Sequence, residues 1–140
     1  MLPISVCIIA KNEEKHIENC LIRLKPYQYE IVLTDTGSTD STLDIASKYT
    51  DKIYHFDWMN DFSAARNFAL SKATNDWILS IDCDEYIEAI DEKLLERLME
   101  KHPQALGQIL IHNRFTQGGQ PSIENIRVSR FFNKKYFLNL

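Results

Sequence analysis

The sequence predicts an α/β fold in which helices cover both faces of a mostly parallel central sheet. The apolar runs at residues 5–10 and 30–34 are continuous rather than alternating, which is typical of strands buried on both faces. Segments with apolar residues at helical spacing follow these runs, and strands that alternate with helices build βαβ units. The 140 residues suffice for one domain, and no repeat, low-complexity tract or linker divides them.

Three expected strands, each followed by an expected helix, make up the first half of the chain. A helix from residue 14 to residue 24 should end at Pro26, because proline cannot continue a helix. The turn at residues 35–40 carries Ser, Thr and Asp side chains that can cap the next helix. The elements that follow are a helix at 41–49, a short strand at 52–56, and a helix with a face of mostly small residues, Phe62, Ala65, Ala69 and Ala73.

The second half continues the alternation and then changes character. An apolar strand at 77–81 precedes a helix at 91–101, which Asp91 caps. We expect one apolar stripe on that helix, formed by Leu94, Leu95, Leu98 and Met99. Beyond it lie expected strands at 107–112 and 127–132, with a turn region at Gly118 and Gly119 between them.

Composition excludes several classes of function. A net charge of −4 argues against binding a nucleic-acid polymer, which needs a cationic face. No apolar stretch approaches the roughly 20 residues that span a bilayer, so we expect a cytoplasmic chain, with the inner membrane face as an alternative location. The three cysteines form no CxxC pair, and the four histidines show no metal-ligand spacing and receive no role. The basic residues near the C-terminus are expected at a solvated edge rather than in an anion-binding patch: Arg127, Arg130, Lys134 and Lys135.

The strand at 77–81 ends in three carboxylates, Asp82, Asp84 and Glu85. Side chains alternate along an extended chain, so Asp82 and Asp84 should point the same way and share one hard cation such as Mg²⁺ or Mn²⁺. A solvated acidic turn is the alternative. An EF-hand is excluded, because no glycine stands at the sixth loop position and Lys93 stands at the twelfth.

Other polar residues follow the neighbouring strands, and in open α/β sheets ligands bind at the carboxyl ends of the strands. We therefore expect Lys11-Asn12-Glu13, Asp35 and Asp82-Cys83-Asp84 to converge on one edge. Asp35 could accept hydrogen bonds from a nucleobase or a ribose, or it could cap a turn. Arg66, beside Asn67, could counter a diphosphate or form a surface salt bridge to Asp61 or Asp57.

Four segments in this order resemble the family-2 glycosyltransferases: residues 5–13, residues 32–40, Ala65-Arg66-Asn67 and Asp82-Cys83-Asp84. The resemblance implies the glycosyltransferase A fold, a Rossmann-like three-layer α/β/α sandwich. It also implies a nucleotide-sugar donor, most often a UDP-sugar, bound with Mn or Mg. Residues 56–63 resemble those of a bacterial branch that includes peptide and cell-surface sugar transferases.

Site residues carried over from the resemblance fall into two sets. Asp82 and Asp84 would bind the metal, with Asp82 also near the ribose, and Asp35 would read the base. The remaining donor-binding residues implied are Ala10, Lys11, Asn12, Glu13, Gly37, Ser38, Arg66, Asn67 and Cys83. The acceptor, whether glycan, lipid or peptide, would attack the anomeric carbon opposite the departing diphosphate, giving inversion.

The sequence departs from the family in two respects. The acidic general base and the acceptor-binding elements of such enzymes usually lie beyond the point that Leu140 marks, so we expect a truncated donor half. Thr36 stands where many relatives carry a second Asp. A non-catalytic nucleotide-binding fragment is therefore an alternative, and a homo-oligomer is compatible with the sequence. A nucleotidyltransferase is disfavoured, because Lys11-Asn12-Glu13-Glu14 is not a Gly-rich basic loop.

Overall fold

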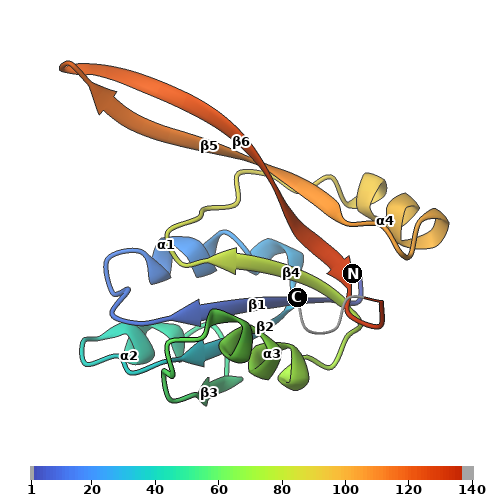
Figure 1. Ribbon diagram of the computed structural model, residues 1–140, viewed down its shortest axis with the longest axis horizontal. Helices are drawn as coiled ribbons and strands as arrows, with labels where there is room; N and C mark the ends of the chain where they lie inside the picture. The colour runs from blue at the N-terminus through green and yellow to red at the C-terminus, as the bar shows by residue number, and fades with distance from the viewer. Residues whose placement is uncertain (1, 137–140) are drawn as a thin grey trace.

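The computed structural model describes residues 2–136, without the side chains of residues 109, 111–115 and 128. Its described strands form one sheet (Figure 1). The strands are β1 (Ile4–Ala10), β2 (Glu30–Asp35), β3 (Ile53–His55), β4 (Trp77–Asp82), β5 (Gly107–Gln117) and β6 (Gln120–Asn133). The helices are α1 (Ile17–Ile22), the 3₁₀ turn η1 (Lys25–Tyr27), α2 (Thr42–Ala46), α3 (Phe62–Lys72) and α4 (Glu92–Lys101).

The strand order in the sheet is β3-β2-β1-β4-β6-β5. The first four strands are parallel, so their carboxyl ends lie at one edge, and β6 and β5 are antiparallel additions. This confirms the predicted mostly parallel sheet. Ala10 of β1 is in register with Asp35 of β2, and Ile9 of β1 with Asp82 of β4. The two acidic strand ends therefore lie on either side of β1, offset from each other by one residue along it.

Helices cover both faces of the sheet, as the sequence predicts. One apolar cluster lies between the sheet and α1, α2 and α4, and it includes the fully buried Ile8 and Leu21. The other lies under α3, where Ala69 packs near Val32 and Ile78. The small side chains Ala65 and Ala69 let α3 approach the sheet closely, since both are almost completely buried. Leu94, expected in the apolar stripe of α4, is instead exposed.

Two helices are shorter than the sequence predicts. Helix α1 begins only at Ile17, because the preceding loop bonds to the loop after β2: Glu14 N donates to Asp40, and Glu14 in turn accepts from Ser41 N. Pro26 does not end a continuous helix but lies within η1, after which Gln28 turns the chain with a φ of 59°. Helix α2 ends at Ala46 rather than at residue 49, and turns lead from it into β3.

The β5–β6 hairpin is longer than the two strands expected at 107–112 and 127–132. Its ladder continues from Gly107 to Gln117, and the hairpin projects away from the rest of the sheet (Figure 1). Only Phe131–Asn133 of β6 pair with β4. An antiparallel pair satisfies its inner backbone groups within itself, so the pairing can continue where no third strand supports it.

Helix α3 starts at a side-chain cap, and we expect its loss to be measurable. The Asp61 carboxylate accepts from Ser63 N at 3.0 Å and from Ala64 N at 3.3 Å. Replacing Asp61 by Ala should lower the free energy of unfolding by about 1 kcal/mol, because two amides lose their partner. Urea denaturation measures the change. Asn at this position should retain most of the stability, and equal stability of the Ala and Asn variants would argue against the cap.

Candidate active site at the carboxyl edge of the sheet

Asp35 ends β2 with its side chain almost fully buried, at 5% exposure. Its carboxylate accepts from Gly37 N at 3.2 Å and from Ser38 N at 3.1 Å. Gly37 adopts a φ of 124°, which side-chain-bearing residues rarely reach, and this lets the chain fold back over the carboxylate. Asp35 therefore caps the turn that follows it, which was one of its two expected roles. Hydrogen bonding of Asp35 to a nucleobase stays a prediction.

His55, to which sequence reasoning gave no role, lies beside Asp35. It is the register partner of Asp35 on β3, and its Nδ1 is 3.5 Å from Asp35 Oδ2. Its Nε2 is 2.7 Å from Asp57 Oδ1. The hydrogen bond with Asp57, and then that with Asp35, raise the pKa of the ring. The signal in the sequence is that His55 ends β3. Because β3 is parallel to β2, its end lies at the same edge of the sheet as Asp35.

The loop after β1 is joined to the loop after β2. Asn12, at a φ of 52°, accepts from Thr39 N at 2.7 Å, and its own N–H donates to Ser38 Oγ at 3.0 Å. Glu13 N donates to Thr42 Oγ1 at 2.8 Å. The side chain of Ala10 is buried and its carbonyl accepts from Thr36 N at 3.0 Å, whereas Lys11 extends into solvent. The structure thus brings Ala10, Asn12, Glu13 and Ser38 together in one pair of loops joined by hydrogen bonds.

The chain turns directly after β4, so the predicted extended geometry of residues 82–84 is wrong. Glu85 N donates to Asp82 O at 3.0 Å, which closes a tight turn. Cys83 points into the core, at 2% exposure, with its Sγ 3.9 Å from Ile9 O. Asp82 and Asp84 on either side of it are both exposed. Burial of the intervening cysteine, and not strand alternation, presents the two carboxylates to solvent; any ligand contact of Cys83 would involve its backbone.

Arg130 of β6 lies against this turn, which corrects the prediction of a solvated edge at this residue. One guanidinium nitrogen, Nη2, is 3.2 Å from Glu85 Oε2 and 3.5 Å from Asp82 Oδ2. The other oxygen of Glu85 accepts from Asp82 N at 2.7 Å. Burial raises the pKa of the Glu85 carboxyl, which Arg130 opposes.

Lys134 is not at a solvated edge either, because its Nζ donates to the Leu70 and Ala73 carbonyls at the end of α3.

A pocket of about 190 Å³ lies beside the acidic turn, between α3 and strands β1, β4 and β6. Arg66, Ser80, Ser129 and Arg130 provide its polar lining. The salt bridge considered between Arg66 and Asp61 or Asp57 is not formed within residues 2–136. Asn67 follows Arg66 on α3 and is partly buried. A larger hollow of about 440 Å³ lies at the opposite edge, near Glu30 and Lys52, where open α/β sheets do not usually bind ligands.

The carboxylate oxygens at the acidic turn suit a hard divalent cation that binds phosphate at the same time. Within the described part of the chain, no group of three His, Cys, Asp or Glu side chains could hold an ion alone. Mg²⁺ and similar ions, however, usually take one or two protein carboxylates and complete their shell with water and phosphate oxygens. The exposed carboxylates of Asp82 and Asp84 match that requirement.

Residues 5–140 match the family model described as glycosyl transferase family 2. The chain belongs to this family. The resemblance of the four motifs is thereby confirmed, and so is the α/β/α architecture that it implies. Several curated relatives are named as glycosyltransferases, and the chain spans a third to a half of the length of the first relatives that it matches. No described helix of this family member is long and apolar enough to cross a bilayer.

Three proteins show what this chain is similar to. A TPR repeat-containing protein of Synechococcus elongatus is 40% identical over 136 residues, which are 96% of this chain and 32% of the relative. A TarS fragment of S. aureus, solved with UDP, is 28% identical at a TM-score of 0.59, covering 72% of this chain and 33% of that one. Glucosyl-3-phosphoglycerate synthase of Mycobacterium tuberculosis was solved with Mn²⁺, UDP and phosphoglyceric acid. It is 25% identical at a TM-score of 0.53, and the match covers 60% of this chain and 34% of the synthase chain.

Proposed function

We propose that this chain is the donor-binding part of an inverting glycosyltransferase that uses a metal-bound UDP-sugar. The observation that carries the proposal is that Asp35 and Asp82 end the two strands on either side of β1, where they pair with the consecutive residues Ala10 and Ile9. Two strand spacings separate them, so their backbones lie about 10 Å apart. A nucleoside diphosphate can extend over such a distance, with its base at one acid and its phosphates at the other. The UDP complex of TarS and the Mn²⁺ and UDP complex of the mycobacterial synthase support this choice of ligand.

Different residues along this edge would bind the nucleoside and the metal ion. Asp35, held by the Gly37–Ser38 turn, would orient a base or ribose, and the joined loops at Asn12 and Ser38 would keep the nucleoside in place. Asp82 and Asp84 would hold the divalent ion. Such an ion, when bound, supplies positive charge that stabilises the departing diphosphate.

Arg66 would add a second positive charge on the α3 side of the diphosphate. The acceptor, a glycan, lipid or peptide, and the residue that takes its proton are not assigned to any described residue. Sugar transfer or donor hydrolysis by the purified chain would distinguish an enzyme from a nucleotide-binding fragment.

Calorimetric titration with UDP, with and without Mn²⁺, tests the proposal. The wild-type chain should bind UDP more tightly when Mn²⁺ is present. Replacing Asp84 by Ala should weaken this Mn²⁺-dependent binding by about 100-fold, since even indirect partners of metal ligands contribute 10- to 100-fold. Binding without Mn²⁺ should change little.

Asp51 provides the matched control, because it is an exposed aspartate outside the carboxyl edge. Asp51→Ala should bind UDP and Mn²⁺ as the wild type does. Equal Mn²⁺-dependent affinities of the Asp84→Ala and wild-type chains would refute the proposed metal site, and absence of UDP binding by the wild type would refute the proposed function.

A further inference from the structure

Arg130 occupies a position between the acidic turn and the adjacent pocket. Its guanidinium contacts Asp82 and Glu85, and the same side chain lines the pocket beside Ser80 and Ser129. It is only 19% exposed. A guanidinium has five N–H donors in a fixed fork, so it can keep one acceptor while it exchanges another.

The pocket also has a positive charge on its α3 side, and no carboxylate of the described residues pairs with that charge. Arg66 of α3 also lines it, and within residues 2–136 Arg66 forms no ion pair with a carboxylate. Two guanidinium groups that face one pocket repel each other unless an anion lies between them. The pocket is therefore suited to a phosphate group, and Arg130 is the member of the pair whose charge is already partly neutralised.

The two contacts of Arg130 differ in how firmly they are held. The Glu85 side chain is 17% exposed and is fixed by its bond from Asp82 N, and it lies 3.2 Å from Arg130. The Asp82 side chain is 58% exposed and lies 3.5 Å away. A divalent cation on Asp82 would repel the guanidinium and compete for the same carboxylate, whereas Glu85 would remain as the anchor.

We propose that Arg130 is a further diphosphate-binding residue, which in the metal-free chain serves as the counter-ion of Asp82. This proposal rests on the proposed function. When the metal and the nucleotide bind, the guanidinium leaves Asp82, keeps Glu85 and turns toward Arg66, so that the two arginines bind the diphosphate in the pocket. The Asp82 carboxylate is thus paired with a cation in both states, first with Arg130 and then with the metal.

Arg130→Met tests the proposal, because the two roles predict opposite changes. Without nucleotide, the variant should bind Mn²⁺ about threefold to tenfold more tightly, since a competing cation is removed; the electron paramagnetic resonance signal of free Mn²⁺ measures this. With Mn²⁺ present, it should bind UDP about tenfold more weakly in calorimetry, since a charged hydrogen bond to phosphate is lost. Binding of uridine, which has no phosphate, should stay unchanged.

Two further variants separate a specific role from damage to the fold. Arg127→Met removes an exposed arginine from the same strand and should alter neither affinity. Arg130→Lys keeps the charge, so its Mn²⁺ affinity should lie nearer to that of the wild type than to that of Arg130→Met. Should Arg130→Met unfold, as judged by its thermal melting, Arg130→Gln takes its place with the same expectations.

The outcomes distinguish this proposal from the one on which it rests. Unchanged or weaker Mn²⁺ binding by Arg130→Met, in a background where the wild type binds Mn²⁺ and UDP, overturns the counter-ion role alone. Unchanged UDP affinity overturns the diphosphate contact alone. A wild-type chain that binds neither Mn²⁺ nor UDP overturns the proposed function, and this proposal with it.

Discussion

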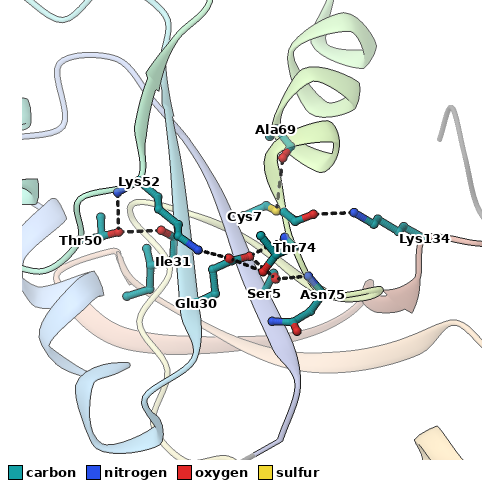
Figure 2. A network of polar contacts seen from close by, with 11 residues as sticks. Ser5, Cys7, Glu30, Ile31, Thr50, Lys52, Ala69, Thr74, Asn75 and Lys134 are labelled. Carbon is teal, nitrogen blue, oxygen red and sulfur yellow. Dashed lines mark hydrogen bonds and ion pairs between the residues drawn. The ribbon is translucent and has the colours of Figure 1, made fainter.

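Replacing Glu30 by Gln is expected to lower the free energy of unfolding by about 3 kcal/mol at neutral pH. Figure 2 shows the Glu30 carboxylate among Ser5, Lys52 and Thr74. It accepts from Ser5 Oγ at 2.5 Å and from Thr74 Oγ1 at 2.6 Å, and it forms an ion pair with Lys52. Burial opposes ionisation of the carboxyl, but the hydrogen bonds from Lys52, Ser5 and Thr74 outweigh it and lower the pKa to about 2. A shift from 4.5 to about 2 corresponds to about 3 kcal/mol.

The same network predicts how stability depends on pH. Because the pKa of Glu30 is lower in the folded chain than in the unfolded chain, its contribution is fully present above pH 4.5 and is lost as the pH falls toward 2. Urea denaturation from pH 7 down to pH 2 should therefore show a steeper loss of stability for the wild type than for Glu30→Gln. Glutamine resembles the protonated carboxyl and cannot titrate.

Glu96→Gln is the matched control for this experiment. Glu96 is exposed on α4, so its replacement should change stability by less than about 0.5 kcal/mol. The network would have no role in stability if Glu30→Gln unfolded at the same urea concentration as the wild type at neutral pH.

Replacing Phe131 by Ala should lower the free energy of unfolding by about 3 to 5 kcal/mol, the usual range for a buried Phe in a core. The side chain is 2% exposed and stacks on Trp77 with ring centroids 5.1 Å apart. Gly107 of β5 packs against it so closely that an added Cβ would lie 3.1 Å from Phe131 Cβ. Phe131 thus joins the hairpin to β4 at the short stretch where the two parts pair.

The loss should also weaken the candidate site, because Arg130 is the preceding residue on β6. Hydrogen exchange of the β6 amides should be faster in Phe131→Ala, and chemical denaturation gives the stability. Phe131→Leu, which fills more of the space, should lose markedly less. A loss below about 1 kcal/mol in the Ala variant would show that β6 is held to the sheet by other contacts.

Prediction from the sequence succeeded for features that depend on local pattern. Continuous apolar runs identified the parallel strands, and the prediction that Asp35 and Asp82 lie at the same edge of the sheet is confirmed; ligand binding at this edge stays a prediction. The boundaries of α1 and α2 were less accurate. Helix α1 starts late because the loop before it bonds to the loop after β2, which takes residues out of the helix. Helical spacing carries no information about such contacts between distant loops.

His55 and Arg130 were not predicted as site residues, and in both cases strand pairing places the residue at the site. His55 meets Asp35 because β3 lies parallel to β2 in register, and Arg130 meets Asp82 and Glu85 because β6 returns antiparallel to β4. The residues in these pairs are 20 or more positions apart in the chain. No local pattern of charge or hydrophobicity encodes which of them become neighbours.

The sequence by itself determined the α/β class, the order of strands and helices, and the acids at the ends of β2 and β4, because these follow from the periodicity of neighbouring side chains. Only the tertiary structure decided that Arg130 is the counter-ion of Asp82, that His55 lies beside Asp35, and that Cys83 is buried between two exposed aspartates. The physical reason is that charge pairing and burial depend on distances in space, which strand order, register and the tight turn after β4 establish.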